Sequence, residues 1–213
     1  MAKLKKLIIA CDGESASGKS TAAKLVSKKY KLLLINSGLI YRYCSKLVIH
    51  QKPKNIVTFL KKKFQTVSYK AISSQKLHSE EISNHVAVLA KNKKIREIVN
   101  KFQIRIIKTN NKICVEGRDI ASKILIKNPK YDVAFYFKCN LNKAAYRRWL
   151  DLKKSTKLED VKKSLRMRTN LDKKRKNSPL IKVKDAILIR SDQLNKKQVL
   201  AKMSKAIDKV LKN

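Results

Sequence analysis

The chain has 213 residues, of which 53 are Lys or Arg and 15 are Asp or Glu, so its formal net charge is +38. This length suffices for one sizeable α/β core with a small inserted lobe. No apolar run approaches the length of a membrane span. The four cysteines form no C-x-x-C pair, which excludes a disulfide frame or a zinc site and favours buried, reduced thiols in a cytoplasmic protein.

The high charge has two interpretations. One is affinity for nucleic acid or a membrane surface through counterion release. The other is a compositional bias toward Lys, Ile and Asn, whose codons are rich in A and T. Ten of the 53 cations are Arg, which leaves 43 Lys spread over the whole chain, and this favours the bias. Where Lys is the default cation, each retained Arg indicates a site that needs a planar, bidentate guanidinium.

A phosphate-binding motif begins at Gly13. Residues 13–20 match G-x-x-x-x-G-K-[ST], the P-loop. The motif follows a short apolar run and opens a stretch with apolar residues at helical spacing. It therefore lies between the end of a strand and the start of a helix, where unpaired N–H groups and the helix dipole favour an anion. We expect Lys19 to reach the β- and γ-phosphates of ATP and the Ser20 hydroxyl to ligate Mg²⁺. The expected ATP-binding residues are Gly13, Glu14, Ser15, Ala16, Ser17, Gly18, Lys19, Ser20 and Thr21.

Short apolar runs alternate with amphipathic stretches along the chain, which predicts a parallel sheet with right-handed crossovers. The predicted strands are 4–11, 32–35, 112–115, 133–137 and 186–189. The predicted helices are 19–29, 39–49, 54–62, 79–90, 93–106, 141–152, 158–171 and 196–211. Pro53 is expected to open the helix at 54, residues 64–69 have a weak alternating pattern, and 70–76 are expected to form a loop. Ligand residues are expected at the carboxyl ends of the strands.

Four further clusters follow the P-loop along the chain. They are Ser-Gly-Leu-Ile-Tyr-Arg at 37–42, Lys-Ile-Arg-Glu at 94–97, Glu-Gly-Arg-Asp-Ile-Ala-Ser at 116–122, and Arg168-x-x-x-Asp172-x-x-Arg175-x-x-Ser178-Pro179-Leu180. In this order, and together with the P-loop, they resemble bacterial cytidylate kinase, a P-loop nucleoside monophosphate (NMP) kinase family. That family typically carries S-G-x-x-Y-R, then D-G-R-D, then R-x-x-x-D-x-x-R-x-x-[AS]-P-L. The resemblance runs from about Leu7 to Ser191.

The resemblance implies an α/β fold, the P-loop NTPase three-layer sandwich with a five-stranded parallel sheet, an inserted NMP-binding lobe and a short helical lid. In this single kinase domain the core takes about 1–37, 107–145 and 176–213, the lobe about 38–106 and the lid about 146–175.

The resemblance also implies roles for individual residues. The catalytic residues are Lys19, Arg118, Arg147 and Arg168, and the CMP-binding residues are Ser37, Arg42, Arg96, Arg118, Asp119, Asp172 and Arg175. Ser37 would contact the cytosine or ribose end of CMP. Three arginines would hold the α-phosphate, namely Arg42, Arg96 and Arg175. Two carboxylates, Asp119 and Asp172, would contact the pentose hydroxyls. With Arg148 in the lid, seven of the ten arginines fall at motif positions.

The implied activity is transfer of the ATP γ-phosphoryl group to CMP or dCMP with Mg²⁺. We expect a cytoplasmic monomer with no obligate nucleic-acid partner and no membrane association. Two alternatives remain open at this point. One is a P-loop kinase for another nucleoside monophosphate or small acceptor, and the other is a basic nucleic-acid-binding protein that retains a P-loop fold.

The chain departs from the family pattern at several positions. Glu116 stands where an Asp is usual, and Asn36 replaces a common Asp before Ser37. Ala87 stands where the family often has a Ser about nine residues before the Arg, which bears on how cytosine is recognised. The segment 64–79 is shorter than the insert of the longer bacterial enzymes, and Arg190 replaces a frequent Asp after the last strand. The remaining arginines, Arg105 and Arg166, receive no role.

Overall fold

A computed structural model describes residues 6–127 and 129–212 of the chain, except for the side chains of Glu80 and Ala87. The chain divides into two compact units, and each is described by itself. The first unit comprises Met1–Leu34 and Asn110–Asn213, and the second comprises Ile35–Thr109. Within the described ranges, no helix is long and apolar enough to cross a membrane.

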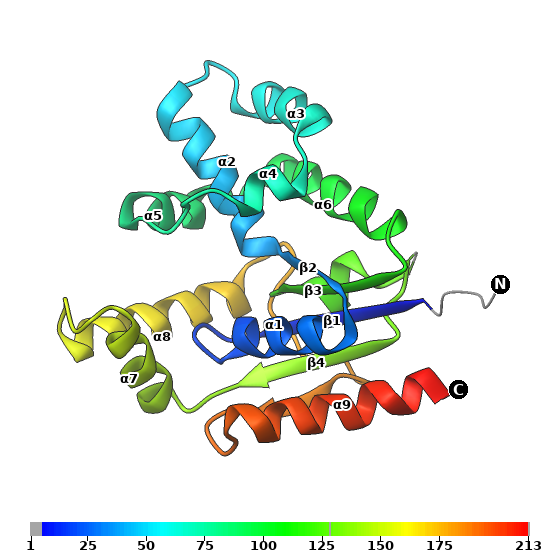
Figure 1. Cartoon of the computed structure of the whole chain (residues 1–213). Helices are drawn as coiled ribbons and strands as arrows, with labels where there is room; N and C mark the ends of the chain where they lie inside the picture. Colours follow the sequence, from blue (N-terminus) through cyan, green and yellow to red (C-terminus); the bar gives the residue numbers. More distant parts are fainter. Residues whose placement is uncertain (1–5, 128, 213) are drawn as a thin grey trace. The chain divides into compact units, whose positions relative to one another are not determined.

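A five-stranded sheet in the order β2-β3-β1-β4-β5 organises the first unit (Figure 1). Its strands are β1 (Leu7–Gly13), β2 (Leu33–Asn36), β3 (Lys112–Gly117), β4 (Val133–Lys138) and β5 (Ile187–Arg190). Strand β1 pairs in parallel with both β3 and β4, and β4 pairs in parallel with β5. The prediction of an α/β fold with a parallel sheet is therefore confirmed.

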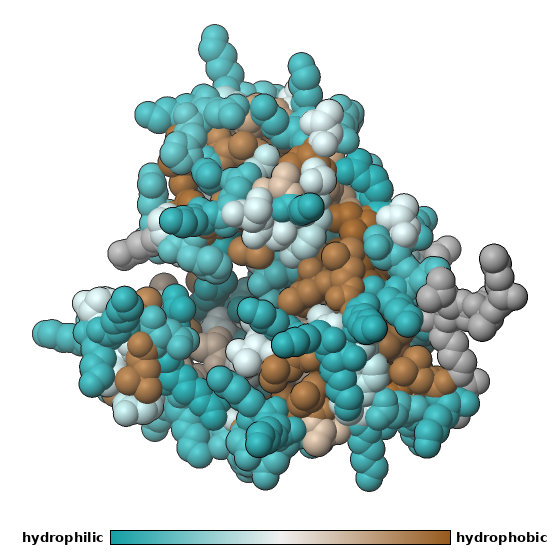
Figure 2. Space-filling view, viewed as in Figure 1, coloured by the Kyte–Doolittle hydropathy of each residue, from teal (hydrophilic) through white to brown (hydrophobic). Residues whose placement is uncertain are grey.

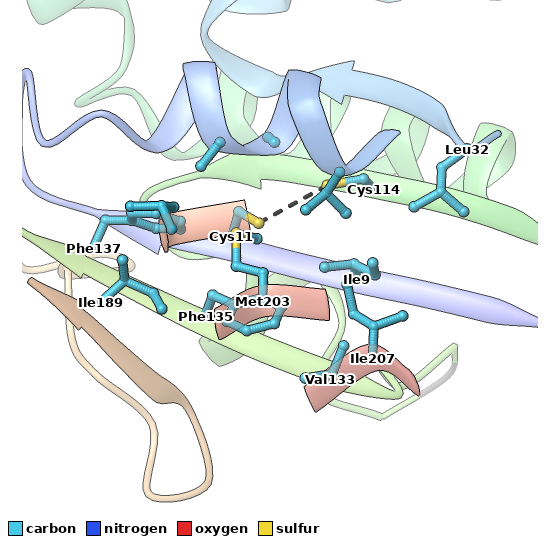
Figure 3. Packing of buried hydrophobic residues seen from close by; sticks show 14 of the residues in the cluster. Ile9, Cys11, Leu32, Cys114, Val133, Phe135, Phe137, Ile189, Met203 and Ile207 are labelled. Carbon is cyan, nitrogen blue, oxygen red and sulfur yellow. Dashed lines mark hydrogen bonds between the residues drawn. The ribbon is translucent and has the colours of Figure 1, made fainter. Parts of the chain in front are cut away.

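Strand β1 is central because its sequence can be covered on both faces. All seven of its residues are buried, as expected for a continuous apolar run in a parallel sheet. Helices α1 (Lys19–Tyr30) and α9 (Lys196–Lys212) lie side by side against this sheet (Figure 1). Met203 and Ile207 of α9 pack onto Phe135 and Ile9 of the strands (Figure 3). The burial of each such side chain contributes roughly 1.5–3 kcal/mol to the stability of the fold.

The cysteines belong to the core, as the sequence predicted. All four are buried and free, and the sulfur atoms of Cys11 and Cys114 lie 3.9 Å apart on neighbouring strands (Figure 3).

Three further elements complete the first unit. A short π-helical turn, η1 (Ile120–Ile124), follows β3, and α7 (Leu141–Asp151) packs against α8 (Leu158–Lys174). The indole N–H of Trp149 donates to the Thr156 carbonyl at 2.7 Å, so this Trp anchors the connection between α7 and α8.

Apart from residues 35 and 36 of β2, the regular structure of the second unit is helical among its described residues. It contains α2 (Ser37–Gln51), α3 (Ile56–Thr66), α4 (Tyr69–Ser73), α5 (Glu80–Leu89) and α6 (Lys93–Lys108). Side-chain oxygens accept first-turn N–H groups at the start of each helix. These caps are Asn36, Asn55, Ser68, Ser79 and Asn92, in the same order. Phe64 of α3 packs edge-on against Tyr43 and Phe102, with ring centroids 5.9 and 4.9 Å apart.

Some predicted boundaries were wrong. Helix α3 begins at Ile56 rather than at 54, because the Asn55 side chain accepts the Thr58 N–H and sets the start. The alternating pattern at 64–69 and the loop at 70–76 are largely helical instead, since α3 continues to Thr66 and α4 occupies Tyr69–Ser73. The first strand runs on to Gly13, and its expected residues 4 and 5 lie outside the described part of the chain.

Candidate active site

The P-loop backbone has positions that require or favour glycine. A Cβ on Gly13 would lie 2.4 Å from the Phe137 carbonyl oxygen, so the close approach of β1 and β4 leaves no room for a side chain. Glu14 N–H donates to that same oxygen at 3.1 Å. Gly18 has φ 75° and Ala16 has φ 54°, both in the left-handed region that favours glycine.

The start of α1 differs from the starts of the helices in the second unit. Gly18 is its N-cap residue, and no side chain among the described residues caps this helix. The first N–H groups of a helix have no partner within the helix. Together with the helix dipole, these N–H groups make the start of α1 suited to a phosphate.

A buried acid, Glu116, contacts the side chains of Lys19 and Ser20 in the P-loop. The Ser20 hydroxyl donates to Glu116 Oε2 at 2.6 Å, and Lys19 Nζ lies 3.6 Å from the same oxygen. Lys19 is 7% exposed and Glu116 is 2% exposed. Burial first, and then the Arg118 guanidinium, lower the pKa of the Lys19 ammonium to about 8, whereas the Glu116 carboxylate acts in the opposite direction. An incoming anion would therefore meet a lysine whose charge is poorly stabilised in its absence.

A row of four charged groups with alternating signs links the turn after β3 to the end of α8. Arg118 Nε lies 2.8 Å from Asp172 Oδ2, and Asp172 Oδ1 lies 3.3 Å from Arg175 Nη1. Arg175 Nη2 lies 3.6 Å from Asp119 Oδ1. Arg175 Nε also donates to the Ser178 carbonyl. Each guanidinium is thus held in a defined orientation by carboxylates or carbonyls.

Helix α8 lies against the P-loop. Lys173 Nζ is 2.7 Å from Glu14 Oε1, and Ser15 N–H faces Thr169 Oγ1 at 3.4 Å. Arg168, exposed on the same helix, is close enough for its charge to lower the pKa of Lys19. Predicted lid residues and predicted ATP-binding residues are therefore neighbours here.

Arg147, on α7, is held elsewhere in the first unit. Its Nη2 donates to the Ser191 carbonyl at 3.0 Å, just after β5, and its Nη1 lies 4.0 Å from Cys139 Sγ. Its neighbour Arg148 is exposed at the end of α7.

The remaining predicted residues belong to the second unit. Ser37 is buried at the first position of α2. Arg42 Nη1 donates to the Leu77 carbonyl at 3.2 Å and to Ser83 Oγ at 2.8 Å. Arg96 is 4% exposed, contacts the Ala90 carbonyl at 3.4 Å, and has its guanidinium carbon 5.7 Å from the centre of the Tyr41 ring. The side chain of Ala87 lies outside the described residues.

Sequence reasoning missed several residues of this arrangement. Asp12, at the end of β1, accepts the Ile120 and Ala121 N–H groups, and it was hidden by its place inside an apolar strand. Glu116 was noted only as a departure from a pattern, although it is the partner of both Lys19 and Ser20. Arg105 has a structural task, since it donates to the Phe64 and Gln65 carbonyls at the end of α3.

Comparisons of the sequence with a family model and with known proteins agree with one another. Residues 9–209 match the family model described as cytidylate kinase. The chain is 30% identical to a cytidylate kinase of Rickettsia akari, covering 95% of this chain and 92% of that protein. It is also 30% identical to a cytidylate kinase of Listeria monocytogenes, with 93% and 95% covered. A bifunctional pantoate ligase/cytidylate kinase of Prochlorococcus marinus is 30% identical as well, but the chain spans only 42% of its length.

Solved structures support the fold alone. An uncharacterised protein from Eubacterium ventriosum superimposes with a TM-score of 0.55 at 17% identity, covering 95% of this chain and 99% of that one. The protein TT1252 from Thermus thermophilus superimposes with a TM-score of 0.50 at 14% identity, covering 96% and 97%.

Proposed function

The chain belongs to the cytidylate kinase family, and from this membership we infer that it transfers the γ-phosphoryl group of ATP to CMP or dCMP. The products would be ADP and CDP or dCDP. The observation that carries this inference is that one unit holds both the P-loop residues Lys19 and Ser20, which contact Glu116, and the row of arginines and carboxylates that ends at Asp119.

The P-loop would hold the donor nucleotide. Backbone N–H groups over Gly13–Thr21 and the uncapped start of α1 would surround the phosphates. Lys19 would neutralise charge on the transferring group. Phosphoryl transfer needs little covalent chemistry from the protein, so positioning and charge stabilisation dominate.

The donor set beside Ser20 fits Mg²⁺. The Ser20 hydroxyl lies against the Glu116 carboxylate, and both present the oxygen ligands that this ion prefers. The described residues contain no group of three or more His, Cys, Asp or Glu side chains able to hold a metal by themselves. This agrees with an ion that shares one or two protein oxygens with nucleotide phosphates and water. When bound, it would neutralise charge on the phosphate oxygens, with Ser20 as ligand and Glu116 close by.

The acceptor nucleotide would be recognised by charge and by hydrogen bonds. We assign Arg42, Arg96 and Arg175 to the CMP phosphate, because a phosphate dianion suits planar guanidinium groups. Asp119 and Asp172, with Arg118, would bind the pentose, and Ser37 would bind the base or ribose end. We assign residues 35–109 to the NMP-binding lobe and the helices within about 146–175 to a lid. The lid would exclude water, since hydrolysis otherwise competes with transfer. The monomeric state, the absence of an obligate nucleic-acid partner and the cytoplasmic location stay predictions.

The experiment that tests this function is ADP release by the purified chain with ATP and Mg²⁺. Four acceptors are compared in parallel: CMP, dCMP, UMP and AMP. We expect CMP-dependent ADP formation, with kcat/KM for CMP or dCMP above that for UMP and AMP. A higher value for UMP or AMP would mean that the substrate assignment is wrong. No acceptor-dependent release at all would refute a kinase of nucleoside monophosphates.

A further inference from the structure

The turn that carries Arg118 and Asp119 is capped from a different strand. Asp12 Oδ1 accepts the Ile120 N–H at 2.9 Å, and Asp12 Oδ2 accepts the Ala121 N–H at 2.8 Å. These are the first two residues of η1 (Ile120–Ile124), whose N-cap residue is Asp119. Asp12 lies on β1, directly before the P-loop glycine, so it ties this turn to the strand that feeds the P-loop.

An Asp at the N-cap position normally accepts the N–H of the second or third helical residue itself, and here the second residue is Ala121. The Asp119 side chain makes no such capping hydrogen bond to η1. Its Oδ1 instead lies 3.6 Å from Arg175 Nη2. Asp12 thus accepts the N–H groups at the start of η1, and the Asp119 carboxylate is left to take its place beside Arg175 in the row of charged groups.

Holding Asp12 in this place is unfavourable in itself. Asp12 is 2% exposed, and burial raises the pKa of its carboxyl to about 6, although the two N–H groups act to lower it. Two charged groups also change this pKa: Asp119 of the turn raises it, and Lys19 of α1 lowers it. A buried carboxylate destabilises a core unless its hydrogen bonds compensate. If packing were the only requirement, an apolar side chain at this position would make the fold more stable.

We propose that Asp12 is a positioning residue for the acceptor nucleotide, which acts by capping η1 so that Asp119 remains directed at the pentose-binding position. This inference rests on the proposed function. Without the cap, the Ile120 and Ala121 N–H groups would need a new acceptor. For the Ala121 N–H the nearest in sequence is the Asp119 carboxylate, which would turn back onto its own helix.

The test is Asp12→Asn, assayed for CMP and for ATP separately. An amide keeps the shape of the side chain but offers one acceptor oxygen and places an N–H₂ group against the other backbone N–H. We expect KM for CMP to rise about tenfold or more, as for loss of a hydrogen bond to a charged group, with KM for ATP changed by less than about twofold. A residue needed only for the fold would not separate the two substrates in this way.

Asp132→Asn is the matched control. Asp132 Oδ2 accepts the Ile8 N–H at 2.6 Å, so it is also a carboxylate that binds a backbone N–H of the sheet, but at the opposite end of β1. It lies outside the proposed machinery, and its replacement should leave both KM values unchanged.

A double-mutant cycle shows whether Asp12 acts through Asp119. In an Asp119→Asn background, Asp12→Asn should raise KM for CMP by less than about twofold, because the carboxylate that Asp12 directs is already absent. Equal effects in both backgrounds would overturn the proposal, and so would an unchanged KM for CMP in the single variant.

If Asp12→Asn fails to fold, Asp12→Ser replaces it, since Ser removes the carboxylate without adding an amide donor. Loss of folding in both variants would make Asp12 a residue of the fold and overturn the proposal. A wild-type chain without CMP-dependent ADP release would overturn the proposed function together with this inference. An active wild type with an unaltered Asp12→Asn variant would overturn the inference alone.

Discussion

At the scale of single residues, the chain keeps charged groups where water cannot fully solvate them. Lys19 and Glu116 are buried beside each other, and Arg96 is buried in the second unit. Even a paired buried charge adds little net stability, because the cost of removing it from water offsets the attraction to its partner, so the retention of these groups indicates a task other than stability. For the first two we propose the donor phosphates and Mg²⁺, and for Arg96 the acceptor phosphate.

If Lys19 binds the ATP phosphates as proposed, the binding of ATP should depend on pH. Its pKa in the free protein is lowered to about 8. Bound phosphates favour the charged ammonium and raise this pKa, so binding should take up a proton from solution where the free lysine is partly neutral. We expect uptake of roughly 0.7 proton per ATP near pH 8.5 and little near pH 7, measured by calorimetry in buffers that differ in ionisation enthalpy.

Lys19→Arg is the control for this measurement, because an arginine stays charged at every pH used. Proton uptake should be absent in that variant. The same uptake in the variant and in the wild type would show that another group titrates.

Arg96 provides a test of the phosphate assignment. Arg96→Lys keeps the positive charge but loses the planar fork that binds a phosphate bidentately. We expect KM for CMP to rise about tenfold or more, measured as CMP-dependent ADP release. Arg105→Lys, on the same helix but bonded to the carbonyls at the end of α3, should leave KM unchanged. An unaltered KM in Arg96→Lys would remove Arg96 from the acceptor site.

At the scale of elements, β1 and its loop show how a strand sets the shape of a site. The strand is central because it can be buried on both faces, and this brings its last residue, Gly13, against Phe137 of β4. The loop then leaves the sheet and reaches α1 without a side-chain cap. The uncapped start of α1, which we propose as the phosphate site, therefore depends on strand packing as much as on the glycine motif.

Gly13→Ala should lower the free energy of unfolding by on the order of 3 kcal/mol, as expected for overpacking against backbone atoms. The added Cβ would lie 2.4 Å from the Phe137 carbonyl oxygen and 2.7 Å from its Cβ. Urea denaturation followed by circular dichroism measures the change. Gly38→Ala is the control: it lies within α2, where Ala favours the helix, and its nearest neighbour is a side-chain oxygen, that of the capping residue Asn36 at 3.0 Å, so its cost should be smaller than that of Gly13→Ala. A wild-type midpoint for Gly13→Ala would contradict the close packing.

At the scale of the whole molecule, the net charge of +38 is the dominant feature. Hydrophilic side chains cover most of the face of the molecule in Figure 2. Charge of one sign repels itself in the compact state and so destabilises it, and salt screens this repulsion. The electrostatic term should therefore favour unfolding most strongly at low ionic strength.

The melting temperature should rise when NaCl increases from about 20 mM to about 300 mM, because the Debye length falls below about 10 Å. Differential scanning calorimetry measures the shift. A variant with Lys202→Glu and Lys209→Glu, both at exposed positions of α9, reduces the charge from +38 by four to +34. It should melt higher than the wild type at low salt and respond less to NaCl. A melting temperature independent of salt would refute destabilisation by self-repulsion.

The sequence by itself determined the local features and the family. The strand–loop–helix at 7–30, most helices and the order of the site motifs follow from apolar periodicity, capping residues and fixed spacings, which depend on neighbours along the chain. Only the tertiary structure decided the pairings that give these motifs their chemistry. Glu116 of β3 meets Ser20 at the start of α1, and Arg118 meets Asp172, which lies 54 residues further on. Asp12 was missed for the same reason. In the sequence it is one polar residue at the end of an apolar run, and only the register of β1 beside β3 brings its carboxylate to the amides that follow Asp119.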